Sequence, residues 1–114
     1  MAGGKIEIAQ LGDDILNAVK GVVGKDLPAL GDFAKAQLEA IAEQTALIAK
    51  GIAAGWIDTE AEKQHWADTL KDMATEFAKT LRALIVITIE KTVNAIINVI
   101  KTTVQAAVGV ALPF

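Results

Sequence analysis

The chain of 114 residues carries 14 acidic and 11 basic side chains, for a net charge of −3, and contains one histidine and no cysteine. A hydrophobic content of 53% excludes an intrinsically disordered chain, and the length predicts a single domain over residues 1–114. The apolar residues recur with the helical period, which predicts that this domain is all-helical. Disulfides and thiolate metal sites are excluded, and the acidic balance offers no basic surface for nucleic acid.

The N-terminal part of the chain predicts two helices. Apolar residues recur at steps of three and four and predict a helix over about 5–23. A second apolar stripe predicts a helix over about 27–54, with Asp26 as its cap and Pro28 in its first turn. Gly55 is the expected terminator, because glycine readily adopts the left-handed conformation that ends a helix.

The turn after the second helix carries the most specific local signal. Thr59 and Glu62 have the spacing of a capping box, in which the hydroxyl and the carboxylate satisfy each other's backbone amides. Gly55 and Trp56 precede this box. Trp56 is either a lid over the end of a helical hairpin or a contact for a partner.

A third helix is predicted over about 59–110, since neither glycine nor proline interrupts the chain before Gly109. The segment 84–89 is rich in β-branched residues, and a strand there is the competing interpretation. We favour the helix, because a lone strand would have no partner and the helical period resumes from Val93.

These lengths predict a long antiparallel helical hairpin that is completed by oligomerisation. Such a hairpin leaves a broad apolar face open, and the segment 83–112 contains only three charged residues, so we expect it to be an apolar assembly segment. The residues expected to form the oligomer interface are Leu84, Ile85, Val86, Ile87, Ile89, Val93, Ile96, Ile97, Ile100 and Val104.

A narrow polar stripe follows the same segment at helical spacing. It consists of Glu90, Asn94, Asn98, Lys101 and Gln105. Three interpretations stay open: the stripe faces solvent, it lines a core or lumen between copies of the chain, or it faces a pore or a membrane interface.

No catalytic chemistry is expected. The chain has no serine and no cysteine, which excludes the corresponding nucleophilic hydrolases. Glu62 and His65 have the Glu-x-x-His spacing of di-iron bundles, but the hairpin places no further carboxylate opposite them. We therefore predict no enzyme, no metal site and no cofactor.

The sequence thus predicts a non-enzymatic structural subunit that binds copies of itself, a larger protein assembly, or both. By analogy with small helical subunits, a phage particle or a similar complex is one such assembly. The alternative is a helical protein that acts on membranes or lipid surfaces as a pore or a coat. The N-terminus resembles no signal peptide, and charges interrupt the apolar window 83–100, so we expect cytoplasmic synthesis and no simple transmembrane helix. Association with a virion is an expectation of the phage-particle analogy alone.

Overall fold

The structure, a computed structural model, describes residues 6–24 and 31–114. These residues form four α-helices and no strand, which confirms the predicted all-α fold. The expected helix cap Asp26 and the first-turn Pro28 lie outside the described residues. The helices are α1 (Ile8–Val23), α2 (Asp32–Ala54), α3 (Glu60–Arg82) and α4 (Ile89–Val108).

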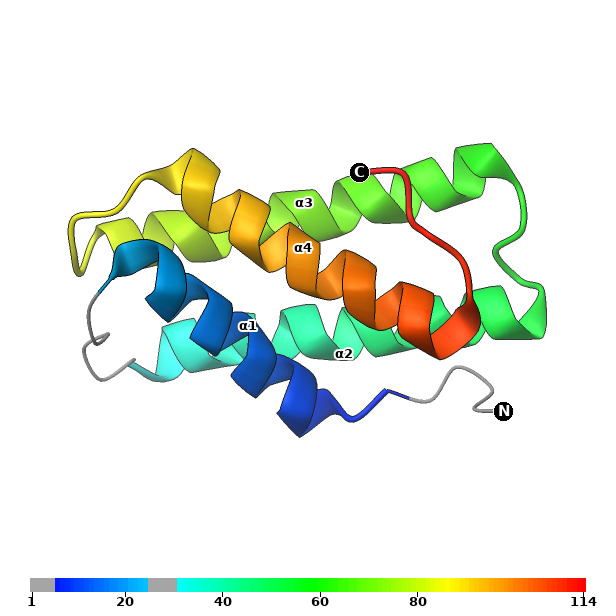
Figure 1. The fold of residues 1–114 in the computed structure, drawn as a ribbon, viewed down its shortest axis with the longest axis horizontal. Helices are drawn as coiled ribbons and strands as arrows, with labels where there is room; N and C mark the ends of the chain where they lie inside the picture. Colours follow the sequence, from blue (N-terminus) through cyan, green and yellow to red (C-terminus); the bar gives the residue numbers. More distant parts are fainter. Residues whose placement is uncertain (1–5, 25–30) are drawn as a thin grey trace.

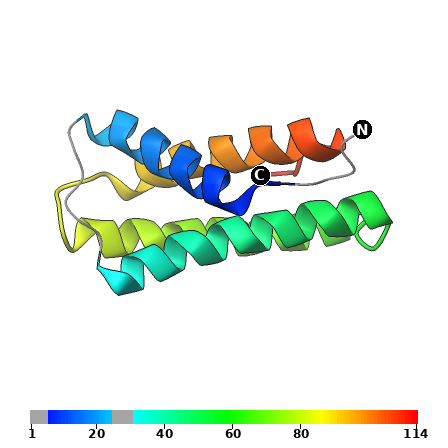
Figure 2. The ribbon, with the colours of Figure 1, turned by 90° about the horizontal axis from the view of Figure 1, so that it is seen from below.

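The helices form an up-and-down bundle in two layers. Helices α1 and α4 lie side by side over the pair α2 and α3, and consecutive helices run antiparallel (Figures 1 and 2). Helix α4 also contacts α2 across the bundle. The principal dimensions are 40 × 25 × 22 Å.

The core is built from the apolar stripe of each helix. The fully buried side chains are mostly aliphatic, with Phe77 as the one aromatic ring among them, so the core is filled by many small contacts. Helix α4 contributes a continuous buried face to this core. The face consists of Val93, Ile96, Ile97, Ile100 and Val104.

The single helix predicted over 59–110 is wrong. The chain leaves helical geometry after α3, forms an irregular connection over 83–88, and turns back as α4, so neither the long helix nor the competing strand over 84–89 is present. The reversal lets α4 cover the face that a two-armed hairpin would leave open. Burial of that face within the same chain therefore outweighs continuation of the helix.

The other end of the bundle contains a locally encoded turn. Gly55 follows α2 with φ +83°, and the N–H groups of Gly55 and Trp56 donate to the carbonyls of Ile52 and Gly51 at 3.2 and 2.8 Å. This is the Schellman arrangement that glycine favours. The turn folds the buried side chain of Ile57 back onto Gly51, where a Cβ atom would lie 2.8 Å from Ile57 Cδ1.

Alanine substitutions at two helical glycines test this packing. Gly12→Ala is expected to raise the free energy of unfolding by about 0.5–1 kcal/mol, because alanine favours the helix and the new Cβ meets no atom within 4 Å. Gly51→Ala is expected to give no net gain, since the Cβ collides with Ile57. Urea denaturation followed by circular dichroism measures both, and equal gains would contradict the close approach.

Candidate functional site

One end of the bundle exposes a group of apolar side chains. This apolar end consists of Val22, Val23, Leu84, Val86 and Ile87, from the last turn of α1 and the connection 83–88 (left in Figure 1). Val86 is 91% exposed and Leu84 is 51% exposed. Single exposed apolar residues are ordinary on protein surfaces, whereas neighbouring ones mark contact sites.

A shallow cavity joins the two parts of the apolar end. It has a volume of about 250 Å³ and lies between the end of α1 and the start of α4. The pocket brings together segments that are distant in the sequence. It is lined by Val22, Val23, Val86, Ile87, Thr88 and Lys91.

Several basic side chains lie at the same end of the bundle. Lys20 lies in the last turn of α1, Arg82 lies in the last turn of α3, and Lys91 lines the cavity. Cations near a helix C-terminus are stabilised by the exposed carbonyl groups and the helix dipole. Asp32 and Glu90, in the first turns of α2 and α4, lie at the same end, so charges of both signs border the apolar end.

The structure separates the predicted interface residues into three groups. The five residues of the buried α4 face, from Val93 to Val104, lie in the core of the single chain. Ile85, Ile87 and Ile89 are half-buried. Only Leu84 and Val86 are exposed, so in this fold the predicted interface is reduced to the connection itself.

Val22 is a surface residue that its sequence pattern does not predict. Its spacing assigns it to the apolar stripe of the first helix, but it is 39% exposed beside the connection. Phe33, in the first turn of α2, is also exposed. No local sequence signal reveals either position, because their exposure depends on where the helices end relative to one another.

The polar stripe lies on the exposed side of α4. Glu90, Asn94, Asn98, Lys101 and Gln105 are all exposed in the single chain. Asn98 borders a groove against α1, together with Asp14 and Ala18. The stripe thus faces solvent in the single chain, while its orientation toward a lumen or a membrane stays a prediction about assemblies.

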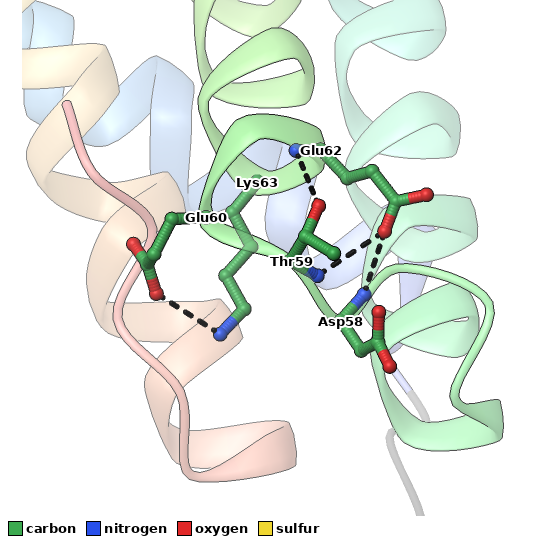
Figure 3. A network of polar contacts seen from close by, with 5 residues as sticks. All are labelled: Asp58, Thr59, Glu60, Glu62 and Lys63. Atoms are coloured by element: carbon green, nitrogen blue, oxygen red, sulfur yellow. Dashed lines mark hydrogen bonds and ion pairs between the residues drawn. The ribbon is translucent and has the colours of Figure 1, made fainter.

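The predicted capping box at the start of α3 is confirmed. The Glu62 N–H donates to Thr59 Oγ1 at 3.1 Å, and Glu62 Oε1 accepts from the N–H groups of Thr59 and Asp58, each at 3.1 Å (Figure 3). Glu60 and Lys63 form an adjacent ion pair at 3.5 Å. Trp56, at the tip of this turn, is 70% exposed.

The Glu-x-x-His pair forms no recognisable metal centre. One carboxylate oxygen of Glu62 already accepts two backbone hydrogen bonds, and the His65 ring lies edge-on to Trp66 with centroids 4.9 Å apart. Among residues 6–24 and 31–114, no three His, Cys, Asp or Glu side chains are grouped closely enough to hold a metal ion. The geometry of this turn is that of a helix start.

A small cavity lies between α2 and α3. It has a volume of about 240 Å³ and is lined by Gln37, Ala40, Asp72, Met73 and Glu76. The Oε1 atom of Gln37 is buried without a hydrogen-bond partner. Its two carboxylates, Asp72 and Glu76, come from successive turns of α3.

The capping box makes stability depend on the ionisation of Glu62. The backbone N–H groups of Thr59 and Asp58 hold the pKa of Glu62 below its usual value of 4.5. A lowered pKa stabilises the folded chain above the unfolded pKa, and this contribution is lost as the pH falls through the folded pKa.

Glu62→Gln is therefore expected to be less stable than the wild type at pH 7, with a smaller difference at a pH well below 4.5. Urea denaturation at both pH values measures the difference. Glu43→Gln, at an exposed residue with no side-chain hydrogen bond or ion pair in the described part of the chain, controls for the lost charge. A Glu62→Gln difference that does not shrink in acid would contradict the role of the carboxylate.

Within the described residues, no helix combines the length and the apolar character needed to cross a membrane. Comparison of the chain with models of protein families, with curated proteins and with solved structures finds no match. The functional conclusion therefore depends on the geometry of the molecule itself.

Proposed function

We propose that the chain is a non-enzymatic structural subunit that associates through its apolar end, with copies of itself or within a larger protein assembly. The observation that carries this proposal is the exposure of Val86, which lines a cavity with Val22, and of Leu84 in the same connection. Covering adjoining apolar side chains is favourable at about 25 cal/mol per Å² of apolar surface removed from water.

The proposal limits the interface to a small part of the predicted assembly segment. The remaining apolar residues of α4 are used by the core of the chain. A phage particle or a similar complex is one form of the larger assembly in this proposal. In that case the subunit would be located in a virion. No catalytic group and no cofactor is assigned to the subunit.

A charge at the tip tests this proposal. Val86→Glu is expected to weaken self-association of the purified chain at least tenfold, because a carboxylate would be buried without a partner in the interface. Leu47→Glu, at a 61% exposed residue in the middle of α2, is the matched control and is expected to associate as the wild type does. Sedimentation over a concentration series gives both dissociation constants.

Equal weakening by the two substitutions would contradict the assignment, because Leu47 is not part of the apolar end. Unchanged association of Val86→Glu would contradict it as well. Circular dichroism of both variants verifies that the bundle remains folded, which is expected because both side chains are largely exposed.

A second candidate function is binding to a lipid surface. It is supported by three cations at this end, Lys20, Arg82 and Lys91, because interfacial protein surfaces combine apolar side chains with basic ones. The carboxylates of Asp32 and Glu90 at the same end oppose it.

Flotation with vesicles of anionic phospholipid tests this second function. Binding that is lost in Arg82→Gln and in Val86→Glu would support it. Absence of the wild-type chain from the vesicle fraction would eliminate it.

A further inference from the structure

The junction between α3 and α4 contains no helix-breaking residue. Helices α1, α2 and α4 are each followed by a glycine with positive φ, at Gly24, Gly55 and Gly109. Helix α3 is followed instead by Ala83, which keeps right-handed helical dihedrals of φ −70° and ψ −18°. No glycine or proline occurs between Trp56 and Val108, so the local sequence does not require the chain to break here.

The interruption itself is short. The Ile85 N–H donates to the Leu81 carbonyl at 2.9 Å, which is an α-helical hydrogen bond beyond the end of α3. Helical bonding resumes where the Thr92 N–H donates to the Thr88 carbonyl at 3.0 Å. Thr88 makes no side-chain capping bond, in contrast to Thr59 at the start of α3. The connection 83–88 therefore keeps a helical hydrogen bond as far as Ile85, and residues 86–88 are its irregular part.

We propose that α3 and α4 join into one continuous helix over residues 60–108 when two copies of the chain exchange their α4 helices. In this dimer, α4 of each copy packs on α1, α2 and α3 of the other. The buried face of α4 makes the same contacts as in the single chain, because the two copies are identical. The partner at the apolar end is thus a second copy of this chain.

The exchange also covers the apolar end. The connection 83–88 lies at one end of the bundle (Figure 1). A continuous helix would leave the bundle there, so the two bundles of the dimer would meet at this end. Val86 and Leu84, exposed in the single chain, then lie at the junction between the copies. The dimer keeps the core contacts of the single chain and adds helical hydrogen bonds and apolar burial at the junction.

This inference rests on the proposed function, since it names the partner of the same surface. Different results would overturn the inference and the proposed function. Association that depends on Val86 without exchange of α4 would overturn the inference and leave the proposed function intact. Absence of any self-association at high concentration would overturn the inference and the part of the proposed function that concerns copies of the chain.

Spin-label distances within one chain distinguish the two arrangements. The chain has no cysteine, so labels at Asp72→Cys and Lys101→Cys attach only at these two exposed positions. Asp72 lies about 15 Å before the end of α3 and Lys101 about 18 Å after the start of α4, at about 1.5 Å per residue. The antiparallel packing therefore sets them side by side, at less than roughly 25 Å.

In the continuous helix the same two residues lie about 44 Å apart. The doubly labelled chain is diluted into excess unlabelled chain, and the dimer is isolated at high concentration. A distance near 44 Å in the dimer supports the exchange. The short distance in the dimer, or a chain that remains monomeric, overturns it.

A proline at the start of α4 provides a second test. Ile89 is the first residue of α4, and Thr88 before it is extended at φ −96° and ψ 116°, which is the conformation that a following proline requires. Ile89→Pro is therefore compatible with the single-chain fold. In a continuous helix the same proline would lie in the interior and break it.

Ile89→Pro is expected to raise the dimer dissociation constant at least tenfold relative to Ile89→Ala, which loses the same side-chain packing. Equal dissociation constants would overturn the inference.

Thr88→Ala, at an exposed position, is expected to strengthen the dimer. Its dissociation constant is expected to fall about fivefold, because alanine favours the continuous helix in both copies. No change, or weaker association, in Thr88→Ala would contradict the inference even if Ile89→Pro failed to fold.

Discussion

The fold depends on the burial of one face of α4 against the other three helices. Val93, Ile96, Ile100 and Val104 meet side chains of α1, α2 and α3 in the centre of the bundle. A fully buried aliphatic side chain contributes roughly 1.5–3 kcal/mol relative to an exposed one, so this face outweighs the local preference of the chain to remain helical through residues 83–88. The break between α3 and α4 is thus a consequence of packing between distant parts of the chain.

This dependence also explains where the apolar surface remains. Because α4 turns inward, the connection 83–88 is left at the tip with few neighbours, and its β-branched residues are directed outward or only half covered. The apolar surplus of the last third of the chain is therefore divided between a core that the chain fills itself and a small end that faces outward. The exposed part is available for binding.

Much of the fold follows from local sequence signals, but the break between α3 and α4 does not. Three features depend only on residues within one or two turns of one another, and each could be predicted. They are the left-handed Gly55, the capping box of Thr59 and Glu62, and the apolar stripe of α1. The break after α3 has no such local signal. For that reason the sequence predicted one long helix, and it overestimated the interface by assigning to it side chains that the single chain buries.

The residues of the apolar end also divide into those that local sequence predicts and those that depend on contacts between distant segments. Leu84 and Val86 could be predicted from their apolar character, whereas the part played by Val22 depends on how α1 ends beside the connection.

Sedimentation equilibrium of the unmodified chain over a range of concentrations tests most directly the central claim, that the chain associates with copies of itself. The account predicts an average mass that rises above the 12.0 kDa of one chain as the concentration increases. A mass that stays at 12.0 kDa throughout, up to the highest concentration, would contradict it.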